Sequence, residues 1–269
     1  MKISKYDSVG NRFLLIDLIS DSYFIEFREK YRLGCIENLL ISEQWKDEAA
    51  NLCSKDSIFG ADGVIILFLD SGCPKALIFN SDGSYGQFSV NGSRCIAFHL
   101  MRKFRENECK FVLGKTIVWA DKSGFDDNVG ISICVEGSVP VKAESEGFKG
   151  NFIDVGNPHF VVIKEIAKDS FLKIAPIIGC GRSFPESAVN VSFFWSQEEG
   201  NCFKGLVFER GVGFTKSCGS AVLALAKLLS CEEEKMHKID FSVEMPGGKM
   251  LVEVHGGSMY KISGYVMRV

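Results

Sequence analysis

Ser89 and Cys218 occupy matched places in the chain, each between an apolar strand-like run and a helix-like run. The step from Asn80 to Ser89 equals the step from Glu209 to Cys218. A helix N-terminus carries unpaired N–H groups and a partial positive charge. A thiol placed there has its pKa lowered from about 8.5. We therefore expect Cys218 to act as a base near neutral pH, or as an acid once protonated.

A second repeat precedes each of these junctions. Val9-Gly10-Asn11 leads into one apolar run and Val155-Gly156-Asn157 leads into another. The paired repeats predict two similar halves, each presenting a helix N-terminus to a shared cleft. Such an arrangement suits a two-sided reaction at one carbon.

Small residues accompany both predicted helix starts, at Asn91-Gly92-Ser93 and at Gly219-Ser220. They would let backbone donors approach a carboxylate closely. Simple helix capping by Ser and Asn is the alternative interpretation, and it needs no ligand. For Cys218 the alternative is a buried structural thiol.

Other polar residues could complete such a site. Glu209-Arg210 could bind an ammonium and a carboxylate, although a surface ion pair would look the same. His159 lies at the end of a predicted strand, where a structural role is the alternative. Four asparagines fall at strand ends or turns, where Asn is common; they are Asn11, Asn80, Asn157 and Asn190.

The elements that must position these residues are mostly strands. Short apolar runs bounded by Gly, Asp, Asn and Ser clusters predict strands. They cover residues 13–18, 63–69, 76–79, 110–113, 116–120, 130–136, 152–155, 159–163, 189–195, 206–209, 239–243 and 250–254. Helical periodicity is clearest over 43–53, 92–104 and 219–229. We predict an α+β protein with mostly antiparallel sheets, each half wrapping a central helix.

The predicted boundary lies near Gly114. It gives an N-terminal domain over 1–114 and a C-terminal domain over 115–259, and the final run 260–269 could return to the first domain.

Composition indicates a soluble globular protein of 269 residues, with a net charge of -3 and a pI near 5.9. Neither value suggests a nucleic-acid or membrane surface. The opening Met1–Asp7 holds no sustained apolar segment, and the apolar run 64–69 is too short to span a membrane. The ten cysteines show no metal-ligand or disulfide spacing. We expect no metal and free thiols in a reducing cytoplasm.

The ordered motifs resemble those of the diaminopimelate epimerase family, a group of cofactor-independent amino-acid epimerases, over nearly the whole chain. The segments that carry the resemblance are Gly10-Asn11-Arg12-Phe13, Gly60-Ala61-Asp62-Gly63, Asn80-Ser81-Asp82-Gly83-Ser84, Gly156-Asn157-Pro158-His159, Asn190-Val191, Glu209-Arg210-Gly211-Val212-Gly213, Cys218-Gly219 and Pro246-Gly247-Gly248.

The resemblance implies two pseudo-symmetric domains with the active site between them, no pyridoxal phosphate, and a family homodimer as a further expectation. It also implies two cysteines that remove and return a proton at the substrate's α-carbon. Cys218 matches the second of them, and His159 and Glu209 match polar helpers near the ammonium group. The remaining matches are substrate contacts: Asn11, Asn80, Asn157, Asn190 and Arg210, with Asn91, Gly92, Gly219 and Ser220 as carboxylate-binding helix ends.

The chain departs from the family pattern at the first cysteine. The family motif Cys-Gly-Asn-Gly is replaced by Ser89-Val90-Asn91-Gly92, and a serine hydroxyl is a far weaker acid than a thiol, so its anion is far more basic. Phe214 stands where the family usually has Glu, and Ala221 follows Ser220 in place of the usual Gly. We expect Cys95 to lie on the helix, facing away from the cleft.

The sequence therefore predicts a cytoplasmic diaminopimelate epimerase of lysine biosynthesis, whose activity Ser89 could impair. The alternatives are an engineered Ser89, a weak epimerase in which Ser89 or water relays a proton, and a diverged racemase, dehydratase or single-base isomerase acting on another amino or imino acid. A catalytically silent amino-acid-binding protein is the alternative outside the enzymes.

Overall fold

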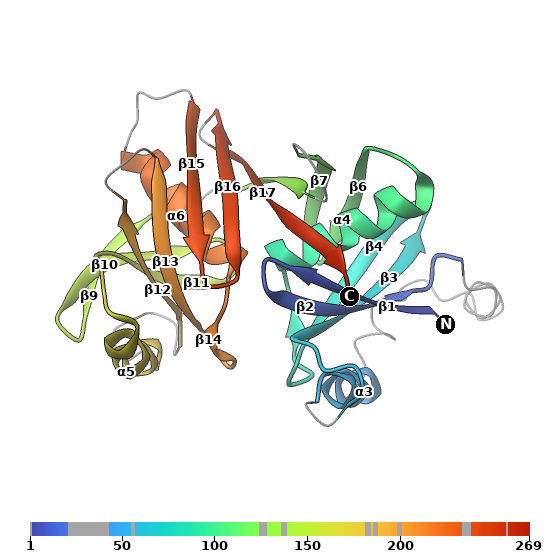
Figure 1. Cartoon of the computed structure of the whole chain (residues 1–269), viewed down its shortest axis with the longest axis horizontal. Coiled ribbons are helices and arrows are strands. Elements are labelled where there is room, and N and C mark those ends of the chain that lie inside the picture. Colours follow the sequence, from blue (N-terminus) through green and yellow to red (C-terminus); the bar gives the residue numbers. More distant parts are fainter. Residues whose placement is uncertain are drawn as a thin grey trace. The chain divides into compact units, whose positions relative to one another are not determined.

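The computed structural model describes residues 2–20, 43–54, 57–123, 128–135, 139–180, 184, 188–197, 201–232, 238–256 and 258–269. By their contacts these residues form two compact units (Figure 1). Unit 1 comprises Met1–Val129 and Val266–Val269, and unit 2 comprises Gly130–Tyr265. The boundary expected near Gly114 falls in the turn between two strands of unit 1, and only the last four residues of the final run group with that unit.

The described residues of unit 1 form helices and a set of connected strands. The strands are β1 (Lys2–Ser8), β2 (Asn11–Asp17), β3 (Gly63–Asp70), β4 (Cys73–Asn80), β5 (Tyr85–Gly86), β6 (Glu108–Leu113) and β7 (Thr116–Lys122). The helices are α3 (Glu43–Cys53) and α4 (Val90–Phe104). Strand β8 (Asn128–Cys134) crosses the division between the units.

Unit 2 has the same kinds of element. Its strands are β9 (Val141–Ser145), β10 (Phe148–Asp154), β11 (Pro158–Ile163), β12 (Asn190–Ser196), β13 (Cys202–Glu209), β14 (Gly213–Thr215), β15 (Lys238–Met245) and β16 (Gly248–His255). Its helices are α5 (Lys168–Gly179) and α6 (Gly219–Glu232). Strand β17 (Met259–Arg268) pairs with β16, and its last residues belong to unit 1, where they pair with β1.

The two units repeat one order of strand pairing. Antiparallel β1–β2 corresponds to β10–β11, parallel β2–β3 to β11–β12, and antiparallel β3–β4 to β12–β13. Parallel β4–β6 then corresponds to β13–β15, and antiparallel β6–β7 to β15–β16. Most pairs are antiparallel, as predicted, but the sheets are mixed. Each parallel pair is joined through one of the described helices, because parallel strands need a long crossover.

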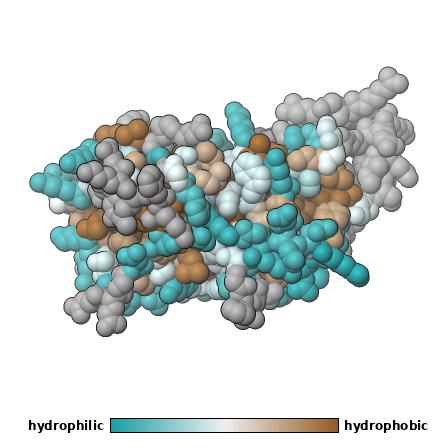
Figure 2. All heavy atoms as spheres, turned by 90° about the horizontal axis from the view of Figure 1, so that it is seen from above, coloured by the Kyte–Doolittle hydropathy of each residue, from teal (hydrophilic) through white to brown (hydrophobic). Residues whose placement is uncertain are grey.

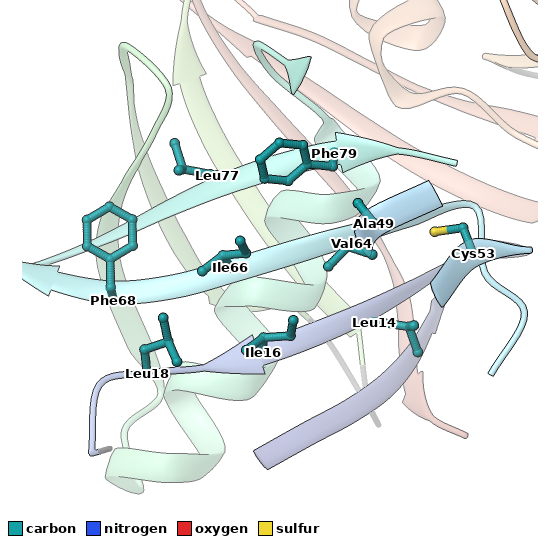
Figure 3. Close-up of a cluster of buried hydrophobic side chains, with 10 residues drawn as sticks. All are labelled: Leu14, Ile16, Leu18, Ala49, Cys53, Val64, Ile66, Phe68, Leu77 and Phe79. Carbon is teal, nitrogen blue, oxygen red and sulfur yellow. The ribbon is translucent and has the colours of Figure 1, made fainter. Parts of the chain in front are cut away.

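In unit 1, buried side chains pack on both faces of the sheet. Alternate side chains of β2, β3 and β4 pack with α3 on one face of the sheet (Figure 3). Since successive strand residues point to opposite faces, Ile78 lies on the other face, where it contacts Gly92 of α4. The first cluster consists of Leu14, Ile16, Leu18, Val64, Ile66, Phe68, Leu77, Phe79, Ala49 and Cys53.

The helices α4 and α6 are the buried ones. Every residue of α4 from Val90 to Met101 is buried, and α6 is buried from Gly219 to Leu228. Helix α4 packs against β1, β2, β3, β6 and β7, while α6 packs against β10, β11 and β16. Surface hydrophobic residues occur among hydrophilic ones (Figure 2), as on ordinary globular proteins. No helix among the described residues is long and apolar enough to cross a membrane.

A polar network fastens α4 to β2. His99 Nε2 lies 3.0 Å and Lys103 Nζ 2.5 Å from Asp17 Oδ2, and the backbone N–H of Ile19 donates to Asp17 Oδ1. Tyr6 Oη lies 2.8 Å from His99 Nδ1. Burial alone would raise the pKa of Asp17, but these hydrogen bonds outweigh it and hold the pKa well below its ordinary value.

We expect Asp17→Asn to lower the free energy of unfolding by about 1–3 kcal/mol at pH 7. A carboxyl with a lowered folded-state pKa stabilises the fold above its unfolded pKa of about 3.9, and this contribution is lost as pH falls further. Denaturant unfolding should therefore show the difference from wild type shrinking below about pH 4. Asp70→Asn is the control, because the Asp70–Lys75 pair is more exposed. An Asp17→Asn deficit that persists unchanged at pH 2 would contradict the assignment.

Candidate active site

Cys218 directly precedes α6, and its carbonyl accepts the first helical hydrogen bond from Val222 N. The side chain is buried, with 4% exposure. Its Sγ lies 3.2 Å from Ser220 Oγ. The position of Cys218 at the start of a helix agrees with the prediction from the sequence.

The expected lowering of the Cys218 pKa is wrong. Burial raises the pKa of this thiol well above its ordinary value, and the negative charge of Glu209 raises it further. Hydrogen bonds from Ser220 and from the backbone of Ala221 act in the opposite direction but are outweighed. At neutral pH Cys218 is therefore a protonated thiol beside a carboxylate, which is the form of a proton donor.

A buried imidazole lies next to this thiol. His159 Nε2 is 3.0 Å from Ser220 Oγ and 3.3 Å from Asn190 Nδ2. Burial and the nearby Arg210 lower the pKa of His159 to about 3, so the ring is neutral. Asn190 Oδ1 accepts from the backbone N–H of Arg210 at 2.8 Å, which leaves the amide nitrogen to face the ring.

Hydrogen-bond roles follow from that arrangement. Asn190 Nδ2 can only donate, so His159 Nε2 must be the accepting nitrogen and Nδ1 carries the proton. His159 Nδ1 is buried and has no hydrogen-bond partner among the described residues. Both polar ends of the Asn190 side chain contact protein atoms, which favours a supporting role over the predicted direct contact with substrate.

Strand register explains why these residues meet. His159 on β11 pairs with Asn190 on β12 in parallel register. The next antiparallel pairing, Val191 with Phe208, brings the start of β12 beside the end of β13, where Glu209 lies. Glu209 Oε1 accepts from Thr215 Oγ1 at 2.6 Å. Unit 2 thus brings together one thiol, one imidazole and one carboxylate.

The corresponding strand positions of unit 1 lack such groups. Phe13 pairs with Gly63, and Gly63 pairs with Asn80. In this order the three residues occupy the strand positions that His159, Asn190 and Glu209 occupy in unit 2. A Cβ on Gly63 would lie 3.0 Å from the Phe13 ring. The repeated fold therefore carries an imidazole and a carboxylate in unit 2, where the equivalent places in unit 1 hold a phenyl ring and an amide.

Ser89 forms the N-cap of α4. Its Oγ accepts from Gly92 N at 3.0 Å, and its carbonyl accepts from Ser93 N. Val90 is buried, and a Cβ on Gly92 would lie 2.5 Å from Ile78 Cδ1. The capping interpretation of Ser89 is thus realised, and the lack of a side chain at Gly92 is required by packing.

Sequence reasoning missed Arg94, which is fully buried in the first turns of α4. Its Nε donates to Ser8 Oγ at 3.0 Å and its Nη2 to Asn91 Oδ1. Arg94 therefore orients the side chain of Asn91, a predicted substrate contact. The only signal was an arginine in the first turns of the predicted helix 92–104, and the sequence alone does not show that this position is buried.

Arg94→Met should lower the free energy of unfolding by about 2–5 kcal/mol, because it leaves buried acceptors on Ser8 and Asn91 without their donor. Arg102→Met on the same helix is the control. Arg102 is exposed and lies 5.3 Å from the Phe98 ring centroid, an interaction of about 0.5–1 kcal/mol. Equal losses in the two variants by denaturant unfolding would contradict the assigned role.

Three of the remaining predicted contacts, Asn11, Asn80 and Asn157, are half-buried. Asn80 Nδ2 donates to Ser84 Oγ at 2.9 Å, and Asn157 lies in the turn before β11. Asn11 Oδ1 is buried without a hydrogen-bond partner among the described residues. Arg210 is exposed, and its Nη1 lies 3.3 Å from the carbonyl of Ala188. Phe214 packs on Phe171, with ring centroids 6.3 Å apart.

Cys95 does not supply a second reactive thiol. It is fully buried on α4, and burial raises its pKa. Among the described residues no group of His, Cys, Asp or Glu could hold a metal ion. Cys35 lies outside the described residues.

Comparison with known proteins agrees with the motifs. The sequence pattern of the family described as diaminopimelate epimerase matches residues 151–263, the part of the chain that contains His159, Glu209 and Cys218. The diaminopimelate epimerase of Elusimicrobium minutum is 29% identical over 94% of this chain and 91% of its own. That of Carboxydothermus hydrogenoformans is 28% identical over 97% and 94%.

Solved structures share the fold at lower identity. A PhzF-family phenazine biosynthesis protein of Bacillus anthracis has a TM-score of 0.67 and 13% identity, covering 100% of this chain and 98% of that one. A hydroxyproline epimerase of Agrobacterium vitis, with bound trans-4-hydroxy-L-proline, has a TM-score of 0.64 and 14% identity, covering 99% and 90%. The resemblance inferred from the ordered motifs is thus confirmed: the chain is similar to diaminopimelate epimerases over nearly its whole length, and the family pattern matches residues 151–263.

Proposed function

We propose that the protein is an isomerase that exchanges the hydrogen on the α-carbon of an amino acid without a cofactor, and that diaminopimelate is its substrate. The observation that carries the proposal is the protonated thiol of Cys218 beside the carboxylate of Glu209, within one short network that includes His159. We also infer that the two units are copies of one α+β module, with α4 and α6 as their central helices.

Charge complementarity supports an amino acid as the substrate. The carboxylate of Glu209 is available to an ammonium group, and the starts of α4 and α6 offer backbone N–H groups to a carboxylate. Binding an ammonium beside Glu209 would offset the negative charge that now raises the pKa of Cys218. The thiol would then ionise more easily in the complex than in the free protein.

In the proposed reaction Cys218 exchanges its proton with the substrate carbon, while Asn91, Gly92, Gly219 and Ser220 hold the substrate carboxylate. The family resemblance adds Asn11, Asn80, Asn157 and Arg210 as contacts to the far end of diaminopimelate. Ser89, or a water molecule, would then exchange the second proton. The implied pathway is lysine biosynthesis; a homodimer and a cytoplasmic location stay predictions.

One observation favours a second candidate, an isomerase with a single working base. Ser89 is committed to capping α4, and a serine hydroxyl is a poor proton-transfer group without a strong base beside it. In that case Cys218 alone would remove and return the proton, and the configuration of the α-carbon would be retained in most turnovers.

Incubation of the protein with LL-diaminopimelate in D₂O separates these candidates. Deuterium at the α-carbon together with inversion to the meso form supports the epimerase. Deuterium without inversion supports the single-base isomerase. Absence of exchange combined with a ligand-dependent rise in Tm would identify a silent amino-acid-binding protein and overturn both enzyme proposals.

A further inference from the structure

Ser220 lies between the thiol and the imidazole of unit 2. Its Oγ is 3.2 Å from Cys218 Sγ and 3.0 Å from His159 Nε2, and the residue is buried with 6% exposure. A serine hydroxyl has a single hydrogen to donate, so it can donate to only one of these two neighbours at a time.

The protonation state of Cys218 determines which neighbour receives that hydrogen. Because His159 Nε2 is an acceptor, the hydroxyl of Ser220 donates to it while Cys218 is a thiol. The S–H of Cys218 can then donate to Ser220 Oγ or to the carboxylate of Glu209. A thiolate at Cys218 can only accept a hydrogen bond. The charged sulfur is then a stronger acceptor for the Ser220 hydroxyl than the neutral His159 Nε2.

We infer that Ser220 is a positioning residue whose hydroxyl rotates from His159 Nε2 to Cys218 Sγ when the thiol gives up its proton, and so stabilises the thiolate. The inference rests on the proposed role of Cys218 in proton exchange. No proton leaves Ser220: the O–H bond stays intact and turns about the Cβ–Oγ bond. His159 remains neutral and keeps the hydrogen bond from Asn190.

The reactivity of Cys218 toward iodoacetamide tests this rotation without any substrate. Cleavage after Lys216 and Lys227 releases a peptide whose single cysteine is Cys218, so mass spectrometry reports its alkylation alone. Rates are compared at one pH below the pKa, where the thiolate fraction limits the reaction. Glu209, His159 and Arg210 are the ionisable neighbours, and the variants leave Glu209 and Arg210 unchanged.

Ser220→Ala should slow the alkylation of Cys218 about three- to tenfold. Losing a hydrogen bond to a charged group reduces the thiolate fraction about ten- to a hundredfold, and the higher nucleophilicity of a more basic thiolate recovers roughly half of this on a logarithmic scale. Ser220→Thr keeps the hydroxyl and should react at nearly the wild-type rate. Loosened packing alone would admit reagent and water, and would speed the reaction instead.

His159→Phe supplies the second arm, because it removes the acceptor that competes for the Ser220 hydrogen. We expect about threefold faster alkylation in this variant, and no further change when His159→Phe is added to Ser220→Ala. A Ser220→Ala rate equal to or above wild type would overturn the inference, as would a His159→Phe effect that persists without the hydroxyl. Neither result depends on turnover, so failure of the proposed function would be seen separately, in the D₂O experiment.

Discussion

Replacing Cys218 with alanine is expected to reduce α-hydrogen exchange into diaminopimelate by at least about 10²–10⁴-fold. Cys218 is the described thiol that combines a helix N-terminus, a neighbouring carboxylate and a buried polar network. Removing it takes away the group that would hold the migrating proton. The measurement is deuterium incorporation at the α-carbon in D₂O.

Cys231→Ala is the matched control, since Cys231 is an exposed cysteine on the same helix. It should exchange at the wild-type rate, and both variants should unfold near the wild-type Tm. Cys218→Ser adds a finer comparison, because a hydroxyl in the same place is too weak an acid to form an anion near neutral pH. Exchange that survives in both Cys218 variants would place the acid–base group elsewhere.

The elements were largely predictable because local periodicity specifies them. Apolar residues at helical spacing predicted α3 with its observed bounds, and α4 and α6 to within a few residues. Helix α5 was missed because Pro176 interrupts its pattern near the C-terminal end. Strand β1 was missed because polar residues fill several of its buried positions, Ser4, Asp7 and Ser8, so its sequence does not alternate between apolar and polar residues.

The grouping of some predicted site residues followed from the sequence, but the electrostatics of Cys218 did not. The motif order identified Cys218, His159 and Glu209, and strand register brings them together in unit 2. The ionisation of Cys218 was predicted with the wrong sign, because a helix start is a local feature whereas burial and a nearby carboxylate arise from tertiary packing. Arg94 and the hydroxyl of Ser220 were missed in their roles for the same reason.

The contrast between the units gives Ser89 its importance. Unit 2 keeps a complete set of acid–base side chains, whereas the equivalent strand positions of unit 1 hold Phe13 and Gly63, and its helix start holds a capping serine. If two groups are to exchange protons, the deficit lies in unit 1. Restoring a thiol there is therefore the most direct way to separate two-base from single-base chemistry.

The double variant Ser89→Cys with Val90→Gly is expected to raise the rate of inversion at the α-carbon by roughly 10²-fold or more, because one positioned acid–base group contributes about 10²–10⁴-fold. A thiol, with a pKa near 8.5, can both take and give a proton near neutral pH, unlike a hydroxyl. Glycine at position 90 removes a buried side chain next to the backbone amides of α4.

The same double variant should be less stable than wild type. Loss of the Ser89 cap costs about 0.5–2 kcal/mol, and loss of the buried Val90 side chain roughly 1.5–3 kcal/mol. Faster inversion together with a lower Tm would therefore be a gain of chemistry and not of folding. Adding Cys218→Ala to the double variant should abolish the gain, since inversion needs both groups. A folded double variant that inverts no faster than wild type would show that the Ser89 hydroxyl is not what limits this chain, and would favour the single-base isomerase.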